Sequence, residues 1–242
     1  MRIIKVDDYD GVSNRTADMI LAQVNLKPDS VLGLATGGSP VGAYKKIVAA
    51  YQNGRVDFAD VTTINLDEYR GIHREHEQSY WHFMQENLLS HVNVQAENCF
   101  IPDGENLDKE SVCREYDQII EKSGGIDLQL LGIGLDGHIG FNEPADSFEK
   151  NTHCVELTES TIEANKRFFA RKEDVPRQAY TMGVLPIMQA KRVVMIASGE
   201  NKAEILKKSF QGPITPQVPA SILQLHPDVT LIADEAALSG LV

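Results

Sequence analysis

Mainly apolar runs of strand length alternate with helical stretches from one end of the chain to the other. Strands are expected over residues 31–35, 61–66, 126–133, 193–197 and 229–233. Helices are expected over residues 79–89, 111–122 and 202–210, after Ser39, and from Ser160 to Arg171. Apolar strands separated by helices are typical of a mostly parallel sheet covered on both faces. We therefore predict a single α/β domain over residues 1–242, with an open sheet in a Rossmann-like three-layer arrangement.

The first junction between a strand and a helix is rich in glycine and hydroxyl groups. It consists of Thr36, Gly37, Gly38 and Ser39, with Pro40 and a helical pattern following. Backbone N–H groups that glycine leaves accessible, a helix N-terminus and two hydroxyls together suit a phosphate group. A plain tight turn before a helix capped by Ser39 explains the same residues, and the sequence alone leaves both interpretations open. No Gly-Lys-Ser/Thr follows, which argues against a nucleoside triphosphate.

Three acid–base side chains follow the run 126–133 within one glycine-rich stretch: Asp136, His138 and Glu143. Carboxylates beside an imidazole can hold one tautomer and tune its basicity, which suits general acid–base catalysis. A metal site and a histidine hydrogen-bonded for structure alone are the alternatives. The spacing matches no common ligand pattern and no second histidine lies close in sequence. We therefore expect no metal here.

The same stretch matches the dinucleotide fingerprint G-x-G-x-x-G over residues 132–137. That fingerprint requires a helix that opens at its third glycine. Gly140 and Pro144 follow instead, and both oppose a helix. We expect no nicotinamide cofactor.

Two further junctions carry charged side chains. Asp67 and Glu68 come directly after the strand at 61–66, and we expect Asp67 to face the interior and Glu68 to face away. Lys202 lies in the first turn of a predicted helix, where either a bound anion or solvent would have to compensate its charge. Because the carboxyl ends of parallel strands share one edge of a sheet, all these junctions are predicted to line a single pocket.

Composition narrows the classes of function. The 242 residues carry 35 acidic and 23 basic side chains, a formal charge of −12, which argues against binding of nucleic acid or an anionic membrane as the main task. The N-terminus lacks the apolar core of a signal peptide, and no stretch is long and apolar enough for a membrane helix. The three cysteines fit neither a disulfide set nor a metal knuckle. We expect a cytoplasmic protein.

Two motifs together resemble the glucosamine-6-phosphate deaminase (isomerase) family: Asn65-Leu-Asp-Glu-Tyr69 and Gly137-His-Ile-Gly-Phe-Asn-Glu-Pro144. The resemblance runs from the loop at residues 34–40 to Lys202 and beyond. The related 6-phosphogluconolactonases share the fold and an Asp-Gly-His element, but they continue with a different run. The chain therefore resembles the deaminases more closely.

The resemblance implies conversion of glucosamine 6-phosphate and water to fructose 6-phosphate and ammonia, without a metal or organic cofactor. His138 would open the sugar ring, oriented by Asp136 and Glu143. Asp67 would carry a proton from C2 to C1.

The resemblance also assigns the phosphate group to the loop at residues 36–39, with Lys202 and Arg167 as further ligands. Residues 157–177 resemble the mobile lid of the family. Within them, Ser160 and Glu163 resemble a capping box at the start of a helix that is expected to reach Arg171.

The chain departs from the allosteric, hexameric members of the family. Those members carry basic residues just after the catalytic loop, where N-acetylglucosamine 6-phosphate binds, whereas Asp146, His153, Val155 and Glu156 occupy that stretch here. We expect no such activation, and a monomer or small homo-oligomer. Two other functions stay open: a sugar-lactone hydrolase that uses His138 to activate water, and a sugar-phosphate sensor without turnover.

Overall fold

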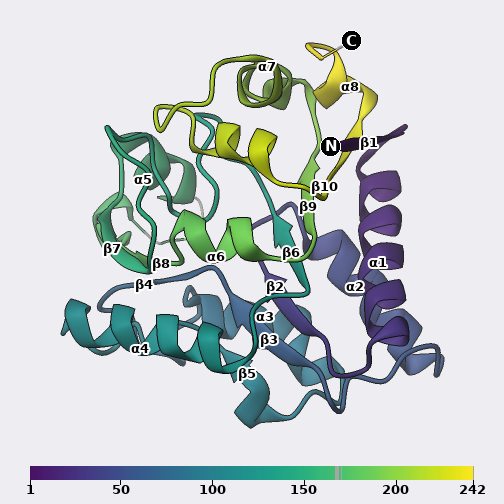
Figure 1. Cartoon of the computed structure of the whole chain (residues 1–242). Helices are drawn as coiled ribbons and strands as arrows, with labels where there is room; N and C mark the ends of the chain where they lie inside the picture. The colour runs from purple at the N-terminus through teal and green to yellow at the C-terminus, as the bar shows by residue number, and fades with distance from the viewer. Residues whose placement is uncertain (167–168, 170, 242) are drawn as a thin grey trace.

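A seven-stranded parallel sheet forms the centre of the molecule, in the order β1-β10-β9-β6-β2-β3-β5 (Figure 1). The computed structural model describes residues 1–166, 169 and 171–241. The seven strands are β1 (Arg2–Val6), β2 (Val31–Leu34), β3 (Thr62–Asn65), β5 (Cys99–Phe100), β6 (Leu128–Leu131), β9 (Val193–Ala197) and β10 (Val229–Asp234). The five strands predicted from the sequence are all present, which confirms the open parallel α/β sheet.

Helices cover both faces of this sheet. The α-helices of the described chain are α1 (Tyr9–Leu26), α2 (Val41–Gln52), α3 (Tyr80–Asn87), α4 (Lys109–Lys122), α5 (Glu159–Asn165), α6 (Val184–Gln189), α7 (Ala203–Gln211) and α8 (Glu235–Leu238), and α5 lies beside the second sheet described below. In Figure 1, α1 and α2 lie together on one side of the sheet and α6 lies on the other. Among the described residues, no helix combines the length and the apolar character needed to cross a membrane.

A second, three-stranded antiparallel sheet adjoins the first, in the order β4 (Asp67–Tyr69), β8 (Gln178–Thr181), β7 (His153–Glu156). Leu66 joins the two sheets, because its N–H donates to Leu34 O at 3.2 Å while its carbonyl accepts from Met182 N at 2.7 Å. Residues 67–69, which the sequence suggested as a loop, are therefore a short strand. Asp67 starts that strand at the junction of the two sheets.

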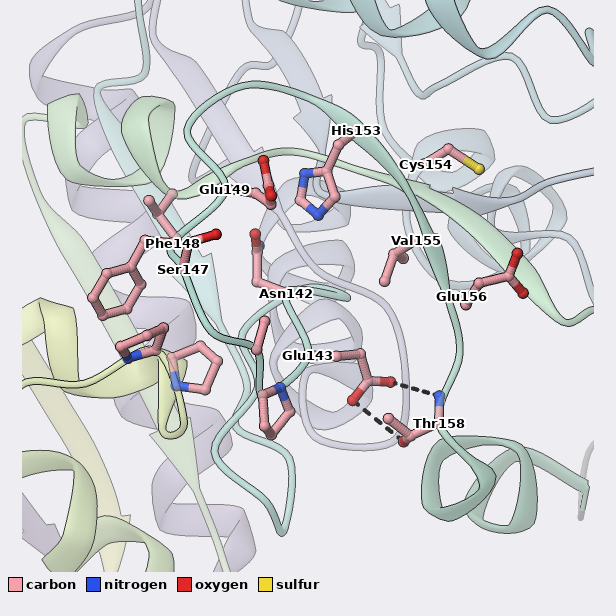
Figure 2. A pocket seen from close by; sticks show the side chains of 15 residues that line it. Asn142, Glu143, Ser147, Phe148, Glu149, His153, Cys154, Val155, Glu156 and Thr158 are labelled. Carbon is pink, nitrogen blue, oxygen red and sulfur yellow. Dashed lines mark hydrogen bonds between the residues drawn. The ribbon is translucent and has the colours of Figure 1, made fainter.

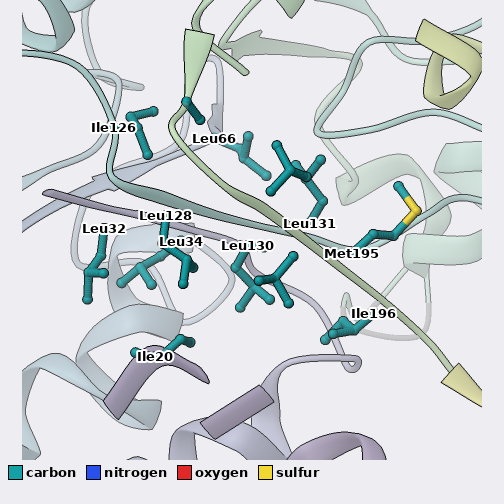
Figure 3. Close-up of a cluster of buried hydrophobic side chains, with 14 of the residues drawn as sticks. Ile20, Leu32, Leu34, Leu66, Ile126, Leu128, Leu130, Leu131, Met195 and Ile196 are labelled. Atoms are coloured by element: carbon teal, nitrogen blue, oxygen red, sulfur yellow. The ribbon is translucent and has the colours of Figure 1, made fainter. Parts of the chain in front are cut away.

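Burial of both faces of the sheet explains why its strands appear in the sequence as continuous apolar runs. Leu130 and Leu131 are neighbours in β6, so they face opposite sides of the sheet, yet both are fully buried (Figure 3). Each such side chain contributes about 1.5–3 kcal/mol to folding. Gln129 directly precedes Leu130 and is also buried, with its amide placed over Gly33 of β2. A Cβ on Gly33 would lie only 2.1 Å from Gln129 Oε1, so this crossing requires a glycine.

Two predicted helix starts need correction. Helix α2 begins after Pro40, and no side chain caps it, so Ser39 is not the cap. Helix α5 is capped by Thr158, whose hydroxyl accepts from Thr161 N, rather than by Ser160. It ends at Asn165, whereas the prediction reached Arg171, and part of the predicted remainder (residues 167, 168 and 170) lies outside the described residues.

Candidate active site

The carboxyl ends of neighbouring strands bring the predicted site residues to one edge of the sheet. The loop 36–39 follows β2, and Asp67 follows β3. The loop from Gly134 to Glu143, here called the histidine loop, follows β6, and Lys202 follows β9. Strands β9, β6, β2 and β3 are consecutive in the sheet, so these segments are neighbours although they are far apart in sequence.

The imidazole of His138 lies between two carboxylates. Its Nδ1 is 2.7 Å from Asp136 Oδ1 and 3.7 Å from Glu143 Oε2. The ring packs flat over the backbone of Gly134, where a Cβ would lie 2.3 Å from His138 Cε1. The short contact pairs the carboxylate of Asp136 with the Nδ1 side of the imidazole and leaves Nε2 for other partners.

Charge and burial oppose each other in this trio. Burial favours the neutral form of His138, but the hydrogen bond and charge of Asp136, with the charge of Glu143, outweigh it and raise the pKa of His138. Burial likewise would raise the pKa of Asp136, but the hydrogen bond and charge of His138 bring it down to about 2. Asp136 is therefore a carboxylate at neutral pH.

The same three side chains could hold a metal ion. One ligand atom from each of Asp136, His138 and Glu143 lies within 4.8 Å of the others. Both carboxylates approach the same nitrogen, which is the geometry of an oriented imidazole as well as of a three-ligand site.

Asp67 is almost fully buried beside this trio. A Cβ on Gly140, in the histidine loop, would lie 3.2 Å from Asp67 Oδ2. Burial, helped by the charge of Glu68, raises the pKa of Asp67 to about 8, against the opposing effect of the charge of His138. Glu68 accepts from the backbone N–H groups of Tyr80 and Trp81 in α3, so it faces away from the trio.

The loop after β2 is open on the side that its glycines face. A Cβ on Gly37 or Gly38 would meet nothing within 4 Å, and Gly37 has a φ of 89°. Tyr9 of α1 fixes the loop from behind, because its hydroxyl donates to Gly38 O at 3.0 Å and accepts from Gly42 N at 2.9 Å. Accessible backbone N–H groups on a braced loop are what an anion site requires.

Of the two cations predicted for the phosphate site, Lys202 lies within the described residues. Lys202 donates from Nζ to Ile133 O at 2.6 Å, at the start of the histidine loop, and its charge lowers the pKa of His138. Arg167 lies outside the described residues.

Three residues of this region were not predicted from the sequence. Thr158 and Thr161 contact Glu143, and the Thr-x-x-Thr spacing of a helix cap was the signal that could have indicated them. Asp234, at the end of β10, accepts from Ser198 Oγ and Gly199 N and so anchors the loop that leads to Lys202.

A cavity of about 490 Å³ adjoins the site and shares Glu143 with it (Figure 2). Its lining comes from the turn at residues 142–149, strand β7, Thr158, Val184, Pro216 and Pro219. Its described lining contains Glu149, Glu156 and His153 but no lysine or arginine. This lining suits a phosphate group poorly.

The chain belongs to the family described as glucosamine-6-phosphate isomerases/6-phosphogluconolactonase, whose model matches residues 9–232. It is 52% identical to a glucosamine-6-phosphate deaminase of Thermoanaerobacter pseudethanolicus, over 99% of this chain and 94% of that protein. A solved monomeric glucosamine-6-phosphate deaminase superposes with a TM-score of 0.96 at 41% identity, covering 99% of this chain and 100% of that one. A 6-phosphogluconolactonase of Thermotoga maritima superposes with a TM-score of 0.78 at 17% identity, covering 97% and 99%, and shares the fold alone.

Proposed function

We propose that this protein is a glucosamine-6-phosphate deaminase, which converts glucosamine 6-phosphate and water to fructose 6-phosphate and ammonia. The observation that supports the proposal most is the close approach of Asp67 to Gly140, which belongs to the same loop as His138. A carbon-acid base and an oriented imidazole within one site are the two groups that an aldose–ketose isomerisation of a cyclic sugar requires.

His138 acts first, on the closed ring. It moves a proton from the C1 hydroxyl to the ring oxygen, which opens the pyranose and leaves an aldehyde at C1. Asp136, at 2.7 Å, orients the imidazole and stabilises its protonated form. Glu143, at 3.7 Å, adds a second negative charge without replacing Asp136 as the hydrogen-bond partner.

Asp67 acts next, on the open chain. As a carboxylate it removes the proton from C2, next to the carbonyl, and returns it to C1. The resulting enolamine becomes an imine at C2, and water replaces the nitrogen there, which releases ammonia and leaves the ketose. The carboxylate of Asp136 and the side chain of Glu143, joined by Asp67 when it is ionised, also favour the ammonium group of the substrate over an uncharged hydroxyl.

The phosphate group is assigned to the loop Thr36, Gly37, Gly38 and Ser39, together with Lys202 and Arg167. Support comes from the accessible loop glycines and from Lys202 at the start of the histidine loop. Holding the phosphate far from C1 and C2 fixes the orientation of the reacting carbons, which is how remote binding accelerates a reaction.

We further propose one catalytic domain in which residues 157–177 act as a lid, and a monomer or small homo-oligomer in the cytoplasm. The monomeric relative supports the first assembly state. The three cysteines are unpaired, which suits a reducing compartment. Limited proteolysis with and without a substrate analogue tests the lid, and equal cleavage in both would contradict it.

The decisive experiment incubates the purified protein with glucosamine 6-phosphate, without added metal, and follows ammonia and fructose 6-phosphate together. We expect equimolar appearance of both, abolished in Asp67→Asn. Hydrolysis of 6-phosphogluconolactone without deamination would assign the protein to the lactonases instead. Tight binding of the sugar phosphate without turnover would identify a sensor.

A further inference from the structure

The first turn of α5 holds the carboxylate of Glu143. Thr161 donates from Oγ1 to Glu143 Oε1 at 2.6 Å, and both residues are buried. Thr158 lies 3.4 Å from the same carboxylate with both its backbone N and its hydroxyl (Figure 2). A buried carboxylate requires such donors, because burial without them is costly.

Thr161 is the principal donor of this group. The hydroxyl of Thr158 has one proton but three acceptors in reach: Glu143 Oε2 at 3.4 Å, Thr161 Oγ1 at 3.2 Å and Ser160 Oγ at 2.9 Å. Its contact with the carboxylate is the longest of the three. Thr161 Oγ1, in contrast, donates to Glu143 at a distance typical of a strong hydrogen bond to a charged acceptor.

The two carboxylates that face His138 are held in different ways. Asp136 is fixed by its own contacts with the imidazole and with the backbone N–H of His138. Glu143 stands 3.7 Å from the ring, too far for a hydrogen bond, and acts on it through charge. The position of the Glu143 carboxylate relative to the ring therefore depends on its hydrogen bonds with Thr158 and Thr161.

We propose that Thr161 is a positioning residue for the deamination reaction, which sets the place of Glu143 beside His138 and ties that place to helix α5. The proposal rests on the proposed function. Because Thr158 caps α5 and Thr161 lies in its first turn, the helix and the carboxylate form one unit. A displacement of α5 would carry Glu143 with it.

Replacing Thr161 by valine tests the proposal, because the shape is kept and only the hydroxyl is lost. We expect kcat to fall about 10- to 100-fold, the factor that corresponds to one hydrogen bond to a charged group, with KM changed less than about 3-fold. Thr161→Ser restores the donor and should restore most of kcat. Thr16→Val in α1 is the matched control, since it removes a buried helical hydroxyl that donates to Val12 O at 2.7 Å, and it should leave kcat unchanged.

A second readout follows the imidazole itself. In an NMR titration, the pKa of His138 should be lower in Thr161→Val than in the wild type. Glu143 raises that pKa by its charge, and without Thr161 it moves away from the ring. Thr16→Val should not change the titration. An unchanged kcat together with an unchanged titration of His138 would overturn the proposal. So would a Thr161→Ser enzyme as slow as Thr161→Val, because side-chain volume would then be responsible.

The two proposals fail separately. If the wild type does not deaminate glucosamine 6-phosphate, the proposed function is wrong, while the titration still shows whether Thr161 positions Glu143. If the wild type turns over and the variant matches it in both readouts, only the role of Thr161 is wrong.

Discussion

Gly140 packs directly against Asp67, and this contact joins the histidine loop to the second sheet. A Cβ at position 140 would lie 3.2 Å from Asp67 Oδ2 and 3.0 Å from Thr181 Oγ1. Gly140 has a φ of 59°, a conformation that other L-residues rarely adopt. The glycine thus allows both the turn of the loop and its close approach to the proposed base.

Gly140→Ala should inactivate the enzyme more than it destabilises it. The positive φ costs about 1 kcal/mol of stability, while displacement of Asp67 by the methyl group should lower kcat about 100-fold. Gly54→Ala is the matched control, because Gly54 has a φ of 67° and nothing within 4 Å of its Cβ position. Thermal unfolding and kcat measured on both variants separate the effects, and equal activities would show that the contact with Asp67 is irrelevant to catalysis.

The high pKa of Asp67 predicts the acidic limb of the pH–rate profile. As the base, Asp67 acts only when ionised, and its pKa is raised to about 8. The value of kcat/KM should therefore rise with pH until about pH 8 and fall about tenfold per unit below it. A limb centred near pH 4 would contradict this assignment of the base.

Glu68→Gln shifts the same limb in a defined direction. The charge of Glu68 raises the pKa of Asp67, so its removal should move the limb to lower pH. Tyr69, Tyr80, Tyr116 and His138 also face Asp67. The charge of Glu68 raises the pKa of Tyr69 and Tyr80, but burial keeps both phenols neutral in this pH range with or without it.

Asp67→Asn should be inactive yet more stable at alkaline pH. A carboxyl whose pKa is higher in the folded state than in the unfolded chain loses stability as the pH rises from its ordinary value of 3.8 through about 8. An uncharged amide of the same shape avoids this loss. Melting temperatures of wild type and variant at pH 5 and pH 9 should diverge at the higher pH, and a variant that melts lower at pH 9 would argue against the raised pKa.

Much of this site can be predicted from the sequence, because the strand order of a parallel sheet determines which segments lie together. Asp67, His138 and Lys202 each follow a strand whose apolar run is plain, and parallel strands bring such ends together whatever the side chains in between. The second sheet could not be predicted from the sequence, because β4 has only three residues and pairs with β8 more than a hundred positions away. Contacts such as that of Tyr9 with Gly38 depend on how α1 packs, which no local pattern encodes.

Lys202→Gln tests the phosphate assignment while keeping a donor for Ile133 O. Loss of the charge should raise KM for glucosamine 6-phosphate about tenfold, with a smaller effect on kcat. Lys208→Gln in α7, whose lysine pairs with Glu204 at the surface, is the control and should leave KM unchanged. Equal KM values for the wild type and Lys202→Gln would remove Lys202 from the phosphate site.

Asp127 supports the sheet from its opposite end. Its buried carboxylate accepts from Lys27 Nζ at 2.6 Å, Lys191 Nζ at 2.8 Å and Val31 N at 2.8 Å. Burial would raise the pKa of Asp127, but the hydrogen bonds from Lys191, Lys27 and Val31 outweigh it and lower the pKa. The three partners come from different segments, so this one carboxylate links the starts of β2 and β6 to the ends of α1 and α6.

Asp127→Asn should therefore cost about 1–3 kcal/mol in urea unfolding at pH 7 without changing KM. A carboxyl with a lowered pKa in the folded state stabilises the protein above its unfolded value and loses that contribution as the pH falls through its folded value. The difference between wild type and variant should persist at pH 5 and shrink only below about pH 3.8. Glu204→Gln, at the exposed pair with Lys208, should unfold like the wild type throughout. A pH-independent difference for Asp127→Asn would mean that shape and not charge supports this end of the sheet.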